Sequence, residues 1–270
     1  AHTVPEIFQQ GEENIEEKGI PSQGEAQKES NIEHWDGVEI QAEQSNLIYA
    51  TGKEYSIDGS TITFKGTDSL KEWKDNVKIG LKDLRDGKVK TKGGEIIQAH
   101  RGIYDSIRAV YDPLFKSKIR KLVDKGEPIN ITGHSRGGMM GTLIALLISE
   151  DFPNVKWGDV NMFSTPHMGN QALYDAIKER GIPLQYIGAL DDPVFHLKIP
   201  NMGDIEQRIY LEELEDGFTK IHRRPTMKEN DLNFKTLKEI KQGIRNKERH
   251  SIKYVKKLLK IAKSKKDKEL

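Results

Sequence analysis

The chain has 270 residues, 35% of them hydrophobic, and contains no cysteine. One sizeable core fits this length, while the lack of cysteine excludes a disulfide framework, a thiol nucleophile and thiolate metal ligands. Because 43 basic residues nearly balance 42 acidic ones, there is no overall positive field that would draw the protein to nucleic acid.

The first 31 residues form a polar segment, rich in Glu, Gln, Gly and Ser. Such a composition buries too little apolar surface to offset the entropy lost on ordering. We therefore expect a polar N-terminal extension over residues 1–31 and a folded domain over 32–270. Short β-prone runs begin that domain at 47–49 and 61–64, each bounded by glycine or polar turn residues.

A long amphipathic pattern follows Gly66. Its apolar residues recur at helical spacing and share one face: Leu70, Trp73, Val77, Leu81 and Leu84. The opposite face carries lysines. This spacing predicts a helix from Ser69 to about Arg85.

Strands and helices alternate from residue 95 onward. Strands are expected at 95–99, 128–132, 160–163 and 184–187, and helices at 103–123, 139–149 and 171–180. This succession predicts an α/β fold with a mainly parallel sheet covered by helices on both faces. The longest strongly apolar run, 143–148, is far shorter than the roughly 20 residues of a membrane-spanning helix, so no transmembrane segment is expected.

The last part of the chain combines a charged stretch with a basic helix. Residues 204–249 are densely charged and only weakly periodic, and we expect them to lie outside the main sheet. From Ile252 to Ala262, apolar residues share a helical face opposite a row of lysines, which predicts an amphipathic helix that packs on its own domain. We expect a soluble protein, either cytoplasmic or secreted after removal of a signal peptide.

A Gly-x-Ser-x-Gly pattern at 133–137 stands between a predicted strand and a predicted helix. A serine hydroxyl is a weak nucleophile at neutral pH and needs sharp presentation beside a base. A strained turn from strand to helix provides that presentation, and small flanking residues keep the turn free of clashes. The pattern alone also fits an ordinary glycine-rich turn, but its position favours Ser135 as a nucleophile. The backbone N–H of Arg136, at the start of the helix, would then donate to an oxyanion.

On this kind of fold an acid and then a base follow the nucleophile in the sequence. Four histidines come after Ser135: His167, His196, His222 and His250. Asp192 comes just after a predicted strand, where its carboxylate would lie at the sheet edge that holds the sites of open α/β folds. Asp191 is the alternative acid.

Further motifs resemble those of the class 3 lipases, the family of fungal triacylglycerol lipases and plant phospholipases A1. In family order they are the oxyanion loop at 64–69, the His-x-Gly-aromatic strand end at 100–104, the Ser-Pro-x-Val-Gly-Asn turn at 164–170, the acid segment at 192–194 and the late histidine at 250–254. The resemblance extends over about residues 45–260. It implies an α/β-hydrolase fold and hydrolysis of the carboxylic esters of lipids through an acyl-enzyme intermediate, without a metal or an organic cofactor.

The resemblance also implies a role for individual residues of these motifs. Ser135 would be the nucleophile, His250 the general base and Asp192 the carboxylate that orients His250. Backbone N–H groups of Thr67 and Arg136 would donate to the oxyanion. The helix after the oxyanion loop would be a lid whose apolar stripe binds substrate: Leu70, Trp73 and Val77. An ordinary amphipathic helix fixed to the sheet is the alternative.

The other histidines have structural roles in this interpretation. His100, His134 and His167 each belong to a turn or strand-end motif and are expected to form structural hydrogen bonds. His196 and His222 are expected at the surface.

The sequence indicates a class of substrate and not a single compound. A lipid or another ester is the expected partner, with peripheral contact to lipid surfaces and none to nucleic acid. Arg136 and the lysine-rich helices suggest cationic rims that would favour anionic or phosphate-bearing lipids. A soluble small-ester esterase or acyltransferase, and a lipase-like interaction module without catalysis, are the alternatives.

Overall fold

The structure of the protein is a computed structural model that describes residues 32–67, 80–205, 208–222 and 250–269. The described residues from Ile32 onward belong to one compact unit. The polar segment 1–31 and the stripe of Leu70, Trp73 and Val77 lie outside the described residues.

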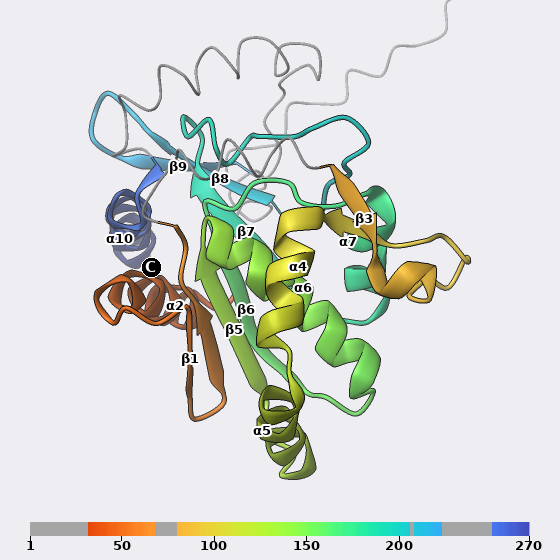
Figure 1. Ribbon diagram of the computed structural model, residues 1–270. Coiled ribbons are helices and arrows are strands. Elements are labelled where there is room, and N and C mark those ends of the chain that lie inside the picture. Colours follow the sequence, from red (N-terminus) through yellow and green to blue (C-terminus); the bar gives the residue numbers. More distant parts are fainter. Residues whose placement is uncertain (1–31, 68–79, 206–207, 223–249, 270) are drawn as a thin grey trace, which may run out of the picture. The chain divides into compact units, whose positions relative to one another are not determined.

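A seven-stranded sheet forms the centre of the described part of the chain (Figure 1). In spatial order its strands are β1 (Tyr55–Asp58), β2 (Thr61–Phe64), β5 (Ile129–His134), β6 (Trp157–Phe163), β7 (Leu184–Ala189), β8 (Arg208–Glu213) and β9 (Thr219–His222). The strands from β2 to β8 run parallel, whereas β1 and β9 are antiparallel at the edges. The expected mainly parallel sheet is confirmed.

Each face of the sheet buries its own apolar layer. Successive residues of a strand point to opposite faces, so Met162 and Phe163 of β6 belong to different layers. Helices on the Met162 face are α4 (Arg101–Val110), α5 (Pro113–Asp124), α6 (Arg136–Asp151) and α7 (Gln171–Glu179). Helices on the Phe163 face are α2 (Trp35–Leu47) and α10 (Ile252–Glu269). Figure 1 shows α4, α6 and α7 on one side and α2 and α10 on the other.

The longest apolar run of the sequence lies in α6, where every residue from 137 to 148 is buried. This helix is apolar because it packs against the sheet and is covered in turn by α4. The helices expected at 139–149 and 171–180 are confirmed, and so is the amphipathic helix that begins at Ile252.

The segment after Gly80 differs from the helix expected to reach Arg85. Gly80 has a φ of +75°, which a right-handed helix does not accommodate. Leu81–Asp83 form β3, which pairs antiparallel with β4 (Gln98–His100) in a sheet of its own. One turn of 3-10 helix, η2 (Leu84–Gly87), follows. The strand expected at 95–99 therefore belongs to this small sheet and not to the main one.

Arg85 ties this small sheet to the far end of α6. Its backbone is left-handed, with a φ of 47°, and its guanidinium donates two hydrogen bonds of 2.6 Å to the carboxylate of Asp151. The Tyr111 hydroxyl donates to the same carboxylate at 2.9 Å. Asp151 ends α6, whereas Ser135 directly precedes it.

The helix expected at 103–123 is interrupted at Pro113. Proline lacks an N–H and disfavours helical geometry in the residue before it, but suits the first position of a helix. Asp112 is extended, with a ψ of 174°, and its carboxylate accepts a hydrogen bond from the N–H of Phe115 at 2.7 Å. The chain therefore ends α4 at Val110 and starts α5 at Pro113.

The sequence does not predict α2. The β-prone run expected at 47–49 is the end of this helix and the start of a 3-10 turn. Polar side chains hold α2 on the sheet: the Gln41 amide donates to the Asp159 carbonyl at 2.8 Å, and the hydroxyls of Ser45 and Thr132 lie 3.0 Å apart. Because its buried face is partly polar, α2 lacks the apolar stripe by which helices are recognised.

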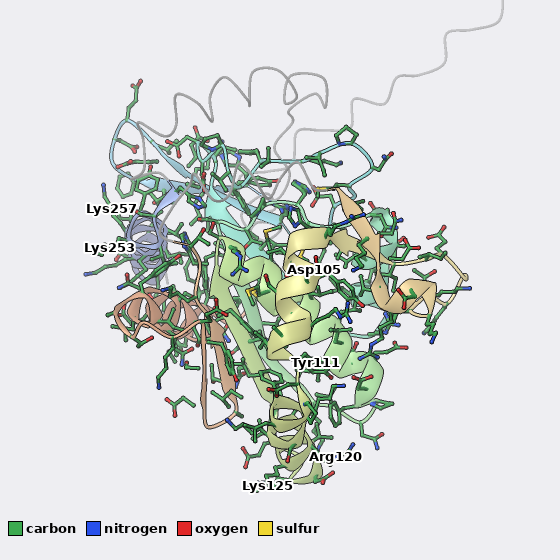
Figure 2. The ribbon with its side chains drawn as sticks, viewed as in Figure 1. Asp105, Tyr111, Arg120, Lys125, Lys253 and Lys257 are labelled. Carbon is green, nitrogen blue, oxygen red and sulfur yellow. The ribbon has the colours of Figure 1, made fainter. Side chains whose placement is uncertain are left out.

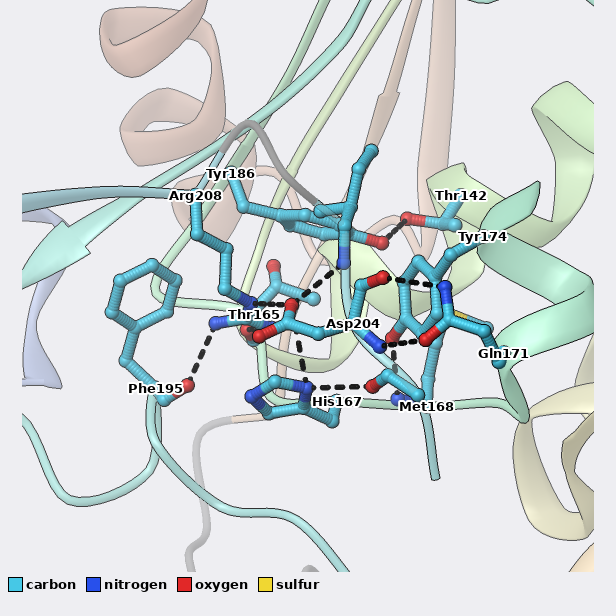
Figure 3. A network of polar contacts seen from close by, with 12 residues as sticks. Thr142, Thr165, His167, Met168, Gln171, Tyr174, Tyr186, Phe195, Asp204 and Arg208 are labelled. Atoms are coloured by element: carbon cyan, nitrogen blue, oxygen red, sulfur yellow. Dashed lines mark hydrogen bonds and ion pairs between the residues drawn. The ribbon is translucent and has the colours of Figure 1, made fainter. Parts of the chain in front are cut away.

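Residues 204–249 are expected outside the main sheet, but β8 and β9 belong to it, so the expectation is wrong for this part of the range. Residues 223–249 lie outside the described residues. Arg208 opens β8 and is only 2% exposed. Its guanidinium donates to the carbonyls of Phe195 and Thr165 at 2.8 and 3.0 Å, and to the carboxylate of Asp204 at 3.0 Å (Figure 3). These bonds replace the hydration that a buried cation loses, which allows a charged residue to start a buried strand.

Candidate active site

Ser135 lies in the turn between β5 and α6, at the carboxyl end of the parallel strands. Its backbone angles, φ 56° and ψ −120°, fall outside the regions that residues other than glycine usually adopt. The N–H of Ser135 donates to the carbonyl of Phe163, the last residue of β6, at 2.8 Å. Strain of this kind costs about 1–3 kcal/mol and clusters at functional sites.

Three glycines around Ser135 stand where a Cβ would clash with a neighbouring segment. A Cβ on Gly133 would lie 2.3 Å from the carbonyl of Gly137, and one on Gly137 would lie 2.3 Å from the carbonyl oxygen of Phe64. A Cβ on Gly138 would lie 1.8 Å from Oγ1 of Thr165. The glycines thus let the start of α6 approach the ends of β2 and β6.

Three side chains from distant parts of the sequence form one chain of hydrogen bonds. His250, two residues before the start of α10, places Nε2 2.8 Å from Oγ of Ser135 and Nδ1 2.8 Å from Oδ2 of Asp192. Asp192 is fully buried after β7, and its Oδ1 accepts a hydrogen bond from the N–H of Val194 at 2.9 Å. Asp191 is exposed. Of these two neighbouring carboxylates, Asp192 is the one that contacts His250.

The buried carboxylate determines which nitrogen of His250 carries the proton. A carboxylate only accepts hydrogen bonds, so Nδ1–H of His250 donates to Asp192. In the neutral ring Nε2 is then an acceptor and receives the hydrogen bond of the Ser135 hydroxyl. The arrangement can therefore move a proton from Ser135 to His250, and Asp192 stabilises the resulting positive ring.

Two segments next to Ser135 offer backbone N–H groups. Arg136 begins α6, and N–H groups in the first turn of a helix have no partner within that helix. The loop after β2 carries the half-buried Thr67, and a Cβ on Gly66 in this loop would lie 2.6 Å from the carbonyl oxygen of His134. The structure thus brings the loop carrying Thr67 and the start of α6 together beside Ser135.

The side chain of Arg136 turns away along the neighbouring helices. Its Nη2 donates to the hydroxyl of Ser106 on α4 at 2.7 Å, and its Nη1 lies 3.2 Å from the sulfur of Met140. The guanidinium of Arg136 therefore contacts α4 and α6, whereas its backbone N–H lies at the start of α6 beside Ser135.

His134 and Tyr49 form a second chain of hydrogen bonds that reaches His250. The carbonyl of His250 can only accept, so Nε2–H of His134 donates to it, at 2.7 Å. Nδ1 of His134 then accepts from the Tyr49 hydroxyl at 2.6 Å. Burial, together with the nearby His250, lowers the pKa of His134 from 6.5 to about 3, so its ring is neutral. The sequence gives no sign of the contribution of Tyr49, because this residue lies 85 positions from His134.

Two other histidines hold backbone segments. Nδ1 of His167 donates to the carbonyl of Gly203 at 3.0 Å (Figure 3), and Nδ1 of His100 accepts from the N–H of Ile103 at 3.3 Å. Burial lowers the pKa of His167 well below its usual value, which keeps that ring neutral. These contacts agree with the expected structural hydrogen bonds.

The expected surface position of His196 is wrong. Only 8% of the residue is exposed, because its ring stacks on Tyr210 with centroids 5.2 Å apart and Nε2–H donates to the Leu190 carbonyl at 2.6 Å. His222 is half-buried and bonds the carboxylate of Glu212.

In the described ranges, no group of three or more His, Asp or Glu side chains is placed to hold a metal ion. None of the described helices combines the length and the apolar character needed to cross a membrane.

Comparison with known proteins identifies a family and a relative. The family described as Lipase (class 3) matches residues 61–202, just over half of the chain. Phospholipase A(1) DAD1, chloroplastic, from Arabidopsis thaliana is 27% identical over 151 residues, which cover 52% of this chain and 33% of that protein. The matched part thus spans about a third of the length of this curated relative.

Solved structures with low sequence identity are similar in fold. A mutant form of MDLA from Penicillium cyclopium has a TM-score of 0.50 and 19% identity, covering 76% of this chain and 74% of that one. A triacylglycerol lipase from Penicillium expansum has a TM-score of 0.47 and 20% identity, covering 63% of this chain and 68% of that one.

Proposed function

Because this chain belongs to the class 3 lipase family and has an α/β-hydrolase fold, we propose that it is a serine hydrolase that cleaves the carboxylic ester bonds of lipids. The observation that carries the proposal is the unbroken hydrogen-bond chain from Ser135 through His250 to the buried Asp192. A module that only binds a partner has no need for a strained serine aligned with an oriented imidazole.

In the proposed first step, Nε2 of His250 takes the hydroxyl proton while Oγ of Ser135 attacks the ester carbonyl carbon. The carbonyl oxygen becomes negatively charged as the tetrahedral intermediate forms. Asp192 offsets the positive charge that develops on His250. His250 then gives its proton to the departing alcohol, which leaves an acyl group on Ser135.

Backbone N–H groups of Thr67 and Arg136 are proposed to bind the negatively charged oxygen. Donors fixed in advance at a helix start cost no reorganisation during the reaction. Loss of one such donor lowers the rate on the order of 100-fold. A water molecule, activated by His250 in the same way as the serine, then releases the fatty acid and restores Ser135.

Part of the positive charge on α10 is paired with acidic residues within the domain. Lys253 and Lys257 lie on the outer side of this helix (Figure 2). Three of its lysines pair with acidic residues of the same domain: Lys256 with Glu43, Lys257 with Glu213, and Lys263 with Asp36 and Glu39. Since the guanidinium of Arg136 is also held by Ser106, we propose acyl lipids as substrates without a requirement for an anionic head group.

A fluorophosphonate probe, which reacts with activated serines, tests the proposal directly. We expect it to label the wild-type protein and not the Ser135→Ala variant. Ser149→Ala is the matched control, because Ser149 lies near the other end of α6 and donates to the Leu146 carbonyl. Wild-type protein that fails to react, or equal labelling of Ser135→Ala, would refute the hydrolase.

The substrate class is tested separately, with emulsified triacylglycerol, phospholipid vesicles with and without anionic lipid, and short p-nitrophenyl esters. We expect hydrolysis of the lipid esters, with little dependence on anionic lipid. Activity confined to short soluble esters would instead identify a small-ester esterase. Strong dependence of the rate on anionic lipid would indicate that the lysines bind the head group.

A further inference from the structure

His250 lies just outside the helix that carries it. Ser251 caps α10, since its hydroxyl accepts a hydrogen bond from the N–H of Tyr254 at 3.1 Å. α10 itself is fixed by burial of Val255 and Leu258 against the sheet. These contacts locate the helix, whereas His250 precedes the cap and its carbonyl forms a contact outside α10.

That contact comes from the residue next to the nucleophile. His134 precedes Ser135, and its Nε2–H reaches the His250 carbonyl at 2.7 Å. The two imidazole rings also lie against each other, with centroids 5.1 Å apart and planes inclined by 37°. One side chain therefore connects the turn that presents the nucleophile with the backbone of a residue 116 positions away.

Tyr49 extends this connection to the loop on the other side of Ser135. It lies in η1 (Ile48–Ala50), directly after α2. Its hydroxyl bonds His134 and also packs against Gly66, where a Cβ would lie 2.2 Å from the hydroxyl oxygen. The same hypothetical Cβ would lie 2.6 Å from the His134 carbonyl. Tyr49 thus touches both the loop that carries Thr67 and the histidine that holds His250.

We infer that Tyr49 and His134 are positioning residues that keep the main chain of His250 and the loop carrying Thr67 in register with Ser135. This inference rests on the proposed hydrolase function. Reacting groups must be held to within a fraction of an ångström, because a displacement of about 1 Å lowers the rate on the order of 100-fold. Neither residue is placed to exchange a proton with Ser135, whose hydroxyl bonds His250.

The neutral state of His134 suits this role. Burial and the proximity of His250 hold the pKa of His134 down, at about 3. His250 becomes positive each time it takes the proton of Ser135, and a charged ring beside it would oppose that step. A neutral His134 can hold the His250 backbone without this repulsion.

Tyr49→Phe tests the pair because it removes one hydroxyl and keeps the ring. The matched control is Tyr111→Phe, which removes a hydroxyl bonded to Asp151. Tyr111 lies at the junction of α4 and α5 (Figure 2), and Asp151 is separated from Ser135 by α6, whose 16 residues extend roughly 24 Å. Steady-state kinetics with a p-nitrophenyl ester and thermal unfolding are measured for both variants.

We expect Tyr49→Phe to lower kcat on the order of 10- to 100-fold, with KM nearly unchanged, and Tyr111→Phe to lower the Tm with kcat near the wild-type value. His134→Gln and His134→Leu provide a second comparison. A glutamine amide can still donate to the His250 carbonyl and a leucine cannot, so Gln should retain clearly more kcat than Leu among folded variants.

The inference is overturned if Tyr49→Phe retains the wild-type kcat, or if it and Tyr111→Phe lose kcat equally for equal losses of Tm. Equal kcat for the Gln and Leu variants of His134 would also overturn it. Fluorophosphonate labelling of the wild type separates the two proposals. A labelled wild type with unaffected variants refutes the positioning role alone, whereas an unlabelled wild type refutes the hydrolase and with it the positioning role.

Discussion

Arg208→Met tests how the loop that carries Asp192 is held. Methionine keeps the aliphatic stem of Arg208 but ends near the position of Nε, so it removes the guanidinium, whose carbon lies 4.9 and 4.6 Å from the ring centroids of Tyr186 and Phe195. It cannot donate a hydrogen bond. The substitution therefore removes the polar contacts to Phe195, Thr165 and Asp204 together with the contacts of the guanidinium on the two rings.

The size of the effect follows from the groups left behind. The carbonyls of Phe195 and Thr165 lose a buried donor, and each unsatisfied buried group costs about 1–3 kcal/mol. Asp204 is 41% exposed and can be hydrated instead. The expected loss is therefore about 2–6 kcal/mol, a large share of the 5–15 kcal/mol typical of a whole domain.

Urea unfolding followed by circular dichroism measures this loss, with Arg85→Met as the control. Arg85 also binds a carboxylate, but the side chains of Arg85 and Asp151 are 32% and 25% exposed, so we expect a cost of only about 1 kcal/mol. We also expect a lower kcat for Arg208→Met, because Phe195 is three residues from Asp192. If the two methionine variants lose equal free energy of unfolding, the inference that Arg208 holds the loop carrying Asp192 is wrong.

Three further variants address the nucleophile turn, the acid and the buried histidine. Gly138→Ala places a Cβ 1.8 Å from Oγ1 of Thr165. It should lower the free energy of unfolding by about 1–3 kcal/mol, or by more if the turn cannot shift, and thermal unfolding measures this as a lower Tm. Asp192→Asn should lower kcat on the order of 10⁴-fold through the wrong tautomer of His250, with KM nearly constant in ester kinetics; a loss below about tenfold would contradict that role. His134 has its pKa lowered from 6.5 to about 3 by burial, so between these values the unfolded chain binds a proton that the folded chain does not. The contribution of neutral His134 to the free energy of unfolding is therefore fully present above pH 6.5 and is lost as the pH drops toward 3. At about pH 4.5 the loss is on the order of 3 kcal/mol. His134→Gln should lose less stability than the wild type between pH 7 and pH 4.5 in urea unfolding, and an equal loss would contradict the assignment.

The parts of the fold that the sequence predicts are those with a local signature. Gly133 and Gly137 stand where backbones meet at distances that exclude a Cβ, and the central strands are apolar because both their faces are buried. The nucleophile turn and the mainly parallel sheet could therefore be predicted without a structure.

Other parts escape prediction because distant partners change the meaning of a local pattern. Gln41 and Ser45 make α2 look solvent-exposed, although both side chains are buried against the sheet. Arg208 makes β8 look like part of a charged excursion, although the carbonyls of Phe195 and Thr165 and the carboxylate of Asp204 satisfy its guanidinium. Tyr49 has no chemical motif around it, and only the fold brings it to His134.

The hydrogen bonds around Ser135 connect residues that are 58, 85, 115 and 116 positions apart. None of these bonds can form within a short stretch of chain. The complete arrangement therefore forms only when α2 and α10, the helices on the Phe163 face, are packed against the sheet. Contacts of such long range form late and at a high entropic cost, and peripheral helices open more readily than a central sheet. The rate of ester hydrolysis should therefore depend on intact tertiary structure and not on secondary structure alone. As the denaturant concentration rises, we expect ester hydrolysis to be lost before the far-ultraviolet circular dichroism signal of the sheet and of α6.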